Sequence, residues 1–420
     1  MIRQHEFILV ASGVLLATAA PIAYRALKRL LARNATVPRT MRVPAENLRE
    51  FTSAVLQTFG VPAGDADTAA EVLILADLRG IDSHGVARLN AYCSMFENGT
   101  MNPNPHVRVV QSTASTATVD GDGGLGLVVA PKANAIAMEK AKECGSGWVS
   151  VRNTFHYGIA GYYSLAALDR DMIGLSMTNS STCVAPLWGK ERMLGTNPIA
   201  IAFPGHRERP LVIDFATSVV PLGKVEEFAR KALRLLPGWA IDHQGRETLA
   251  PEEVMSSGAL RNLGGDFDHG GHKGYCLSAM VDVLCAVLSG GNWGPLVDGL
   301  VLGRTRPAAA TDADAPVGIG HFFGALRIDG FRDVAAFKAT MDDWITTFRK
   351  SAPIDPSRPV RVPGDPEWAA FDERSKNGVP VKLAVLADLR DIAERVGVAP
   401  PFDVSEVDLS SVKRVIVAST

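Results

Sequence analysis

Apolar residues recur at helical spacing toward both ends of the chain. Leu48, Phe51, Val55 and Phe59 lie three or four positions apart and Gly60 follows them, which predicts a helix from 46 to 59. Similar spacing predicts further helices over 65–79 with Asp65 as the N-cap, around His84, over 331–349 and over 381–396. Both ends of the folded part are therefore expected to be helical.

The middle of the chain alternates short apolar runs with helical patterns. The runs predict strands over 116–119, 148–151, 173–178, 199–203, 211–215 and 321–328. Helical patterns cover 132–144, 160–168 and 274–288, and the last is so uniformly apolar that it is expected to be buried. Residues 303–316 combine Pro, Asp and small residues and predict a surface loop. The expected organisation is a helical part over 41–120, an α/β domain over 121–330 and a helical part over 331–420.

The first forty residues have a different composition. Residues 7–24 are almost entirely apolar, and Arg25, Lys28, Arg29 and Arg33 follow them. Such a run is just long enough to span a bilayer, and the charges after it would keep the body of the chain in the cytoplasm. An organellar presequence and a wrongly assigned start, with Met41 as the true first residue, remain open alternatives.

Composition excludes several classes of protein. The 420 residues are 47% hydrophobic and 21% charged, which is typical of a folded enzyme and not of a disordered chain. A formal net charge of −2, without a basic cluster beyond the N-terminus, argues against a nucleic-acid partner. The five cysteines form neither a CxxC pair nor a zinc-like cluster, so reduced thiols and no metal are expected.

The run from Asp82 to Arg88 contains the most informative candidate chemistry. On a helix, His84 and Arg88 would share a face four residues apart. Histidine exchanges a proton near neutral pH, and the arginine fork matches a carboxylate. Together they indicate a site for a 2-hydroxy acid. The alternative is an ordinary helix start capped by Asp82 or Ser83.

A glycine-rich run imitates a dinucleotide-binding fingerprint. Residues 121–126 fit GxGxxG between a predicted strand and a helix, with Glu143 near the position of a ribose-binding acid. Pro131 is expected to delay the helix, and Asp120 and Asp122 would place negative charge beside a pyrophosphate. A loop that supports the active site is the preferred interpretation, and a Rossmann fold is not expected.

From Leu48 to Val396 the chain resembles the type 2 malate/L-lactate dehydrogenase family. The motifs that carry the resemblance occur in the family's order, at 76–89, 151–158, 178–180, 194–200, 213–218, 223–226 and 270–275. The resemblance implies an α/β fold with a mixed-sheet, non-Rossmann nicotinamide-binding domain and a helical domain built from both chain ends. It also implies NAD or NADP as cofactor, a 2-hydroxy or 2-oxo acid as substrate, and a homodimer.

The same resemblance implies roles for individual residues. His84 would exchange the substrate proton, and Asp214, otherwise a strand-end turn residue, would orient it. Ser83, Arg88, His156 and Thr196 would lie near the substrate, although His156 could instead be a packing residue. The implied cofactor contacts are Thr178, Asn179, Ser180, Lys224, His272, Lys273, Gly364 and Asp365. For His272 and Lys273 the physical reason is a glycine-rich helix start over 270–274, where free N–H groups and the lysine favour phosphate.

Departures from the family pattern leave the substrate open. Pro221 and Leu222 replace a common Ala-Arg pair, and Cys276 replaces a small residue. Malate, lactate and related acids are not distinguished, nor are NAD and NADP. Two alternatives remain open, namely reduction of a cyclic imino acid or diketo-sugar acid, and a membrane-tethered binding protein that has lost catalysis.

Overall fold

The computed structural model describes residues 40–297 and 316–403. The described residues from Met41 onward form one compact unit. The apolar run 7–24 and nearly all of the predicted loop 303–316 lie outside the described residues. Within the described ranges, none of the helices combines the length and the apolar character needed to cross a membrane.

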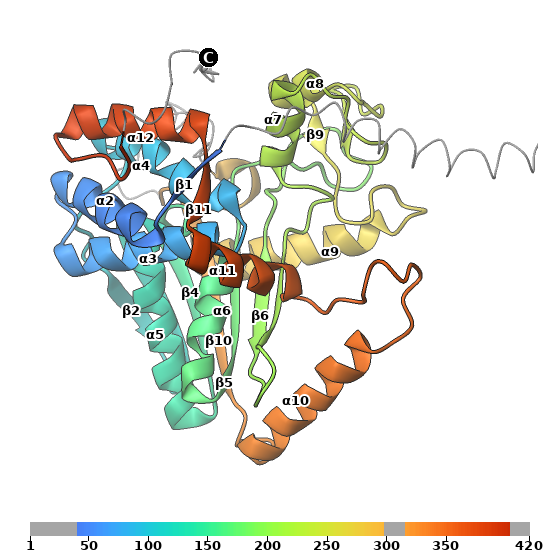
Figure 1. The fold of residues 1–420 in the computed structure, drawn as a ribbon. Coiled ribbons are helices and arrows are strands. Elements are labelled where there is room, and N and C mark those ends of the chain that lie inside the picture. Colours follow the sequence, from blue (N-terminus) through green and yellow to red (C-terminus); the bar gives the residue numbers. More distant parts are fainter. Residues whose placement is uncertain (1–39, 298–315, 404–420) are drawn as a thin grey trace, which may run out of the picture. The chain divides into compact units, whose positions relative to one another are not determined.

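A seven-stranded mixed sheet forms the centre of this unit (Figure 1). Its strands, in spatial order, are β2 (Arg108–Ser112), β3 (Thr116–Gly124), β4 (Ser146–Thr154), β10 (Ile319–Arg327), β5 (Met172–Thr178), β6 (Ile199–Phe203) and β7 (Leu211–Phe215). β3 and β4 run parallel, and the other neighbouring pairs run antiparallel. The expected α/β class is thereby confirmed, and the sheet differs from the largely parallel sheet of a Rossmann fold.

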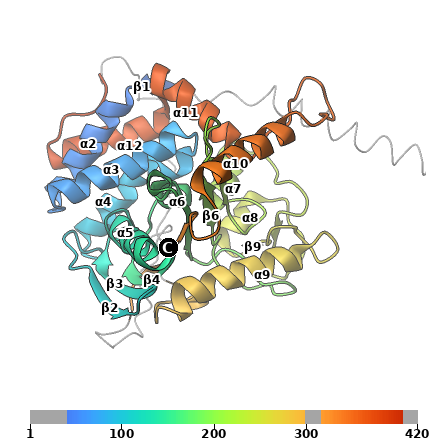
Figure 2. The same cartoon turned by 90° about the horizontal axis from the view of Figure 1, so that it is seen from below.

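Side chains of β10 alternate between two apolar layers, as a strand buried on both faces requires. Phe323 packs with α5 (Gly126–Cys144) and with Tyr163 of α6 (Ala160–Ala166), whereas Phe322 packs with Val281 and Cys285. Those two residues belong to α9 (Gly271–Asp282) and to the π-helical turn that continues it, Val283–Val287. Figure 2 shows α5 and α6 on one side of the strands and α9 on the other.

A helical layer is built from residues near both ends of the described chain. It contains α2 (Ala45–Thr58), α3 (Ala63–Leu78), α4 (Leu89–Glu97) and α12 (Leu383–Val396), together with the small sheet of β1 (Thr40–Val43) and β11 (Val379–Lys382). Leu48, Leu73, Leu89 and Leu389 share its core. The predicted helices over 46–59 and 381–396 are confirmed, because their apolar stripes face each other in this layer.

The glycine-rich run 121–126 forms a support for neighbouring backbone. The expected delay of the helix by Pro131 is wrong, since α5 begins at Gly126 and contains Pro131. A Cβ on Gly126 would overlap the carbonyl oxygens of Phe155 and His156, so glycine allows α5 to start against the segment that follows β4. Asp120 pairs with Arg152 and is therefore already neutralised by the protein.

Several expected boundaries change. Asp65 does not cap α3, whose N-cap is Pro62, and instead pairs with Lys132 at 2.7 Å. The prediction that 274–288 is buried is wrong for one face of this helical segment. That face exposes Met280, Val283, Val287 and Leu288. The expected division at 120 falls within β3.

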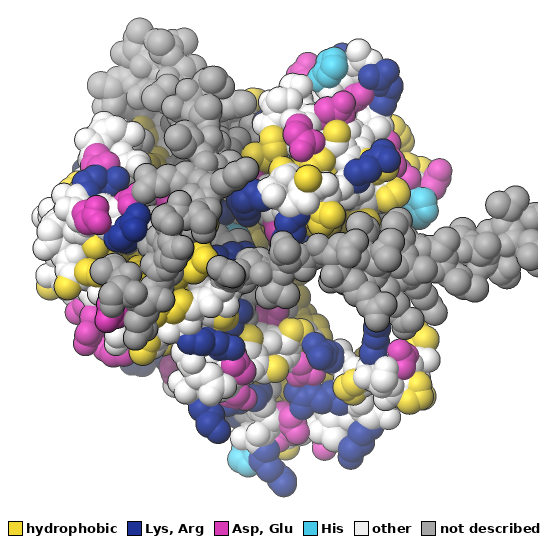
Figure 3. All heavy atoms as spheres, turned by 45° about the horizontal axis from the view of Figure 1, so that its top comes forward, with side chains coloured by type: hydrophobic (Ala, Val, Ile, Leu, Met, Phe, Trp, Pro, Cys, Tyr) yellow, Lys and Arg dark blue, Asp and Glu magenta, His cyan; other side chains and the backbone are white. Residues whose placement is uncertain are grey.

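The remaining elements carry weaker sequence signals. They are α7 (Leu222–Arg230), β8 (Ala240–Ile241), α8 (Pro251–Ser256), β9 (Ala259–Leu260), α10 (Val334–Arg349) and α11 (Asp365–Asn377). Of these, only α10 was expected from the pattern. The face shown in Figure 3 intersperses basic and acidic side chains, in keeping with the nearly balanced charge of the sequence.

Candidate active site

His84 and Arg88 lie on two short turns and not on one α-helix. The 3-10 turns Asp82–His84 and Val86–Arg88 are separated by Gly85, and α4 starts only at Leu89. The expected helix around His84 is therefore wrong, and no helix cap involves Ser83. Ser83 Oγ lies 2.8 Å from His84 Nδ1, and Arg88 Nε donates to the Ser83 carbonyl at 2.6 Å. The two side chains are thus held by the same residue.

A buried carboxyl group fixes the break between these turns. Asp77 Oδ2 accepts the Val86 N–H at 2.8 Å, and a Cβ on Gly85 would overlap the carboxyl group. Burial raises the pKa of Asp77 to about 8, with the Val86 N–H opposing the shift. Arg374 of α11 donates to the Asp77 carbonyl and to Asp82 Oδ1, each at 2.5 Å. Sequence reasoning missed Asp77 and Arg374, although a carboxylate within the apolar α3 was a usable signal.

His156 brings a second imidazole to the site. It follows β4, and its ring centroid lies 5.4 Å from that of His84. Its Nδ1 lies 2.6 Å from the hydroxyl of Tyr92, a buried residue of α4. The pKa of His84 is lowered to about 3, first by burial and then by Arg88. Burial, followed by His84 and Arg88, also lowers the pKa of His156 well below its usual value, so both rings are neutral near pH 7.

Arg88 is a cation whose charge acts on both rings. No carboxylate in the described ranges forms an ion pair with its guanidinium. Its Nε is used by Ser83, which leaves the terminal nitrogens for another acceptor. An anion bound there would be hydrogen-bonded by a planar fork beside two neutral imidazoles.

Asp214 lies near the end of β7, and its side chain accepts a hydrogen bond from a backbone amide. Its Oδ2 accepts the Gly161 N–H at 2.9 Å, where α6 begins. The residue is exposed at the surface, yet desolvation by the surrounding protein raises the pKa of its carboxyl group to about 6. The Gly161 N–H and Arg79 oppose this shift. The hydrogen bonds of the described residues do not join Asp214 to His84. Its expected role in orienting His84 stays a prediction.

Two of the residues over 178–180 have side chains whose hydrogen-bonding groups already have partners within the protein. Buried Thr178 Oγ1 bonds Gly320 O at 2.9 Å and lies 2.8 Å from His321 Nδ1. Buried Asn179 donates to Asp282 Oδ1 at 3.0 Å and accepts from Gly320 N–H at 2.9 Å. These side chains tie β5 to β10 and α9. Ser180 Oγ, by contrast, is half-buried and accepts the Thr196 N–H at 3.0 Å.

Similarity to known proteins agrees with this fold. A family model described as malate/L-lactate dehydrogenase matches residues 43–390. This chain belongs to that family. The malate dehydrogenase of Pyrococcus abyssi is 43% identical over 359 residues, which cover 85% of this chain and 96% of the relative. The L-sulfolactate dehydrogenase of Methanocaldococcus jannaschii is 35% identical over 357 residues, or 85% of this chain and 98% of that protein.

A solved structure supports the same assignment. Malate dehydrogenase from Entamoeba histolytica is 32% identical and matches with a TM-score of 0.80, covering 86% of this chain and all of that one (100%). The expected family and the expected class, a dehydrogenase, are confirmed.

The residues at the start of α9 indicate whether this malate/L-lactate dehydrogenase family member could bind the phosphates of a dinucleotide there. Its glycines serve the protein's own packing, because a Cβ on Gly271 or Gly274 would overlap the backbone of Gly265 or Leu263. These glycines are thus needed for packing, and the expected phosphate contact stays a prediction. Nevertheless, the buried Nδ1 of His272 has no hydrogen-bond partner among the described residues, and Lys273 is exposed. A buried donor or acceptor without a partner, beside a helix N-terminus, fits an anionic ligand.

The other expected cofactor residues have partners of their own. Lys224 pairs with Glu227 at 2.8 Å. Asp365 at the start of α11 accepts from Arg349 at 2.6 Å, and this pairing lowers the pKa of Asp365. Gly364 has a φ of +96°, and a Cβ there would lie 3.2 Å from Val212 N. Glycine is therefore needed to seat α11 against β7, two residues from Asp214.

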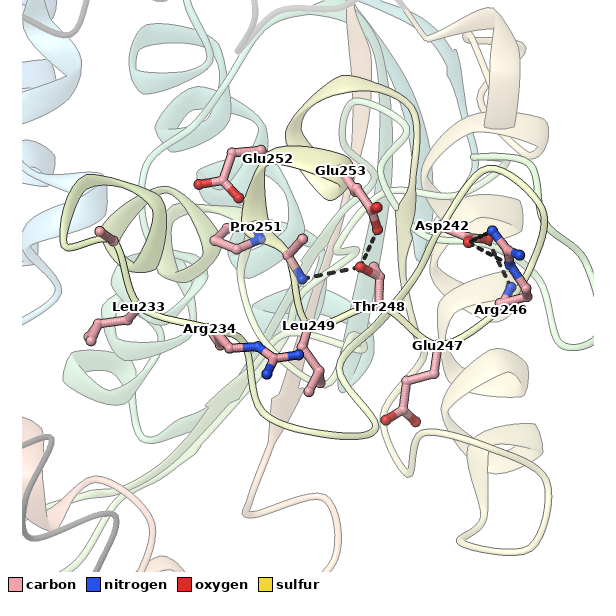
Figure 4. A pocket seen from close by; sticks show the side chains of 12 residues that line it. Leu233, Arg234, Asp242, Arg246, Glu247, Thr248, Leu249, Pro251, Glu252 and Glu253 are labelled. Atoms are coloured by element: carbon pink, nitrogen blue, oxygen red, sulfur yellow. Dashed lines mark hydrogen bonds and ion pairs between the residues drawn. The ribbon is translucent and has the colours of Figure 1, made fainter.

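An open pocket of about 730 Å³ lies elsewhere, between the end of α7, the segment 242–249 that follows β8, and α8 (Figure 4). Its lining includes Arg234, Glu247 and Glu252, and Arg246 is already paired with Asp242. None of the expected site residues lines it. This pocket therefore plays no part in the proposed chemistry.

Proposed function

We propose that the protein is an NAD- or NADP-dependent dehydrogenase that interconverts a 2-hydroxy acid and a 2-oxo acid of the malate or lactate type. The observation that carries the proposal is the cluster of Arg88, His84 and His156. It combines an arginine without an ion-pair partner among the described residues and two neutral imidazoles. For this reaction the protein must supply at least a group that binds the substrate carboxylate and, beside it, a group that transfers a proton.

Arg88 would hold the substrate carboxylate. The Nε bond to Ser83 fixes the plane of the guanidinium, and two terminal nitrogens can then donate in parallel to both carboxylate oxygens. That arrangement also sets the position of C2, the carbon next to the carboxylate, relative to His84.

His84 would take the hydroxyl proton during oxidation and return it during reduction. Because Arg88 contributes to the low pKa of His84, a carboxylate bound to Arg88 would neutralise that contribution and raise the pKa. Substrate binding would thereby prepare the imidazole to carry a proton. Ser83 Oγ at Nδ1 would keep the ring oriented.

The start of α9 would hold the cofactor phosphates, with His272 and Lys273 as contacts. Ser180, Lys224, Gly364 and Asp365 would form the rest of the site, which Thr178 and Asn179 would hold in place through their bonds to β10 and α9. When bound, the nicotinamide would supply or accept the hydride at C2. Asp214 would lie close to the reacting groups, and Thr196 near the substrate.

We also propose a cytoplasmic homodimer. Met280, Val283, Val287 and Leu288 form an exposed apolar stripe along α9 and the turn that continues it. Burying this stripe against a second copy would remove a surface that monomeric proteins seldom expose. Sedimentation equilibrium of the purified protein would distinguish a dimer from a monomer.

Arg88→Lys is expected to raise the KM for 2-oxo acids by about 10-fold to 100-fold, because lysine keeps the charge and loses the planar fork. The KM for NADH should change by less than about 2-fold. Steady-state kinetics with each substrate varied in turn measures both values.

The matched control for Arg88→Lys is Arg395→Lys, which alters an arginine of α12 that pairs with Glu97 of α4. Its kinetic constants should stay at wild-type values. A folded Arg88→Lys protein with an unchanged KM for 2-oxo acids would remove Arg88 from the substrate site.

The two directions of the reaction should differ in their pH dependence. Reduction needs protonated His84, whose pKa is lowered to about 3, so kcat/KM for reduction should fall about 10-fold per pH unit between roughly pH 5 and 8. Oxidation needs neutral His84, and its kcat/KM should stay level over that range. A reduction profile that is flat over this range would contradict the assignment. A bend near pH 6 that disappears in Asp214→Asn would bring Asp214 into the chemistry.

A further inference from the structure

Two groups contact the Nδ1 nitrogen of His156. Tyr92 Oη lies 2.6 Å from Nδ1, and the backbone N–H of Gly158 donates to the same atom at 3.3 Å. Tyr92 comes from α4, whereas Gly158 follows His156 in the chain. The ring is therefore held from two independent parts of the fold.

These contacts decide which nitrogen carries the proton. A backbone N–H can only donate, so Nδ1 must accept, and the proton of the neutral ring must lie on Nε2. A proton on Nδ1 would point at the Gly158 amide hydrogen. The Tyr92 hydroxyl keeps its proton as well, since burial raises the pKa of Tyr92 above its usual value, and it therefore donates to Nδ1.

We propose that Tyr92 is a positioning residue that holds His156 as the Nε2–H tautomer, so that His156 presents a hydrogen-bond donor to the substrate. No hydrogen bond within the described ranges uses Nε2, and the neighbouring ring is that of His84. This inference rests on the proposed function. It assigns a different role to each imidazole. His84 exchanges the proton, and His156 donates a hydrogen bond to the oxygen on C2.

This arrangement is expected to polarise the C2 carbonyl group of the substrate. In the 2-oxo acid, the C2 oxygen gains negative charge as hydride reaches the carbon, and a fixed N–H donor stabilises that charge. A neutral ring is sufficient for this purpose, provided that its N–H already points at the oxygen.

The tautomer can be measured without turnover. The protein is labelled with ¹⁵N-histidine, and His156 is assigned by difference from His156→Gln. Nitrogen chemical shifts and ring couplings should show a protonated Nε2 and a bare Nδ1 in the wild type. In Tyr92→Phe the spectrum should shift toward a mixture of tautomers, and kcat should fall about 10-fold, the value of one net hydrogen bond, with KM changed by less than about 3-fold.

Tyr162→Phe is the matched control, because Tyr162 also packs against the helical core and its hydroxyl interacts with Glu71 instead of a histidine. It should leave the His156 spectrum and kcat unchanged. A proton on Nδ1 in the wild type would overturn the proposal, and this outcome needs no variant to fold. A Tyr92→Phe protein with the wild-type tautomer and the wild-type kcat would also overturn it. The predicted spectra in a protein that reduces no 2-oxo acid would instead count against the proposed function and leave the role of Tyr92 in place.

Discussion

His84→Ala is expected to lower kcat by about 10²-fold to 10⁴-fold, which is the usual cost of removing a general acid or base. The loss should appear in both directions of the reaction. Binding of NADH, followed by its fluorescence, should stay within about 2-fold of wild type, because His84 contacts Ser83 and the His156 ring and lies outside the expected phosphate-binding segment.

His243→Ala provides the matched control, since His243 lies exposed on a surface turn. It should have wild-type kcat and a wild-type thermal midpoint. A folded His84→Ala protein that keeps more than half of the wild-type kcat would show that another group carries the proton. His156 would then be the first candidate, because it is the neighbouring imidazole.

Gly85→Ala is expected to destabilise the protein by about 2–5 kcal/mol, the combined cost of overpacking and of losing a buried hydrogen bond. The new methyl group would overlap the Asp77 carboxyl group, which must then move away from the Val86 N–H. Activity should fall as well, because the same turn positions His84 and Arg88. Urea unfolding and kcat measure the two effects.

Gly64→Ala is the control for this substitution. Gly64 lies in the first turn of α3, and a Cβ there would have no neighbour within 4 Å. Alanine should be neutral or stabilising by up to about 1 kcal/mol, because it restricts the unfolded chain and favours the helix. If Gly85→Ala were as stable as Gly64→Ala, the Asp77 contact would not define the turn.

Periodicity predicted those elements whose burial follows a simple pattern. The strands over 199–203 and 211–215 coincide with β6 and β7, because a short apolar run is typical of a strand within a buried sheet. Pro131 shows the limit of such reasoning. It was expected to delay α5, yet Gly126 opens the helix because only glycine fits against the carbonyl groups of Phe155 and His156. Contacts between distant segments overrode the local preference.

Motif order predicted the family, and the structure brings together Ser83, His84, Arg88 and His156 as expected. Their support was not predictable from spacing. Arg374 reaches Asp82 from nearly three hundred residues away (|i−j| = 292), and Tyr92 meets His156 across 64 positions. Residues such as Thr178 and Asn179 bear polar groups that suit a ligand, but only the fold reveals that β10 and α9 already satisfy them.

Transfer of deuterium from a labelled nicotinamide tests the central claim most directly. Reduced NAD or NADP carrying two deuterium atoms at C4 of the nicotinamide is incubated with the purified protein and a panel of acceptors. The panel contains 2-oxo acids, including oxaloacetate and pyruvate, and a cyclic imino acid. Mass spectrometry and proton NMR then locate the label in the product. The proposed function predicts one deuterium at C2 of a 2-hydroxy acid, and its near-complete loss when His84→Ala replaces the wild type. A product without deuterium at C2, or transfer only to the carbon of a cyclic imine, would contradict it.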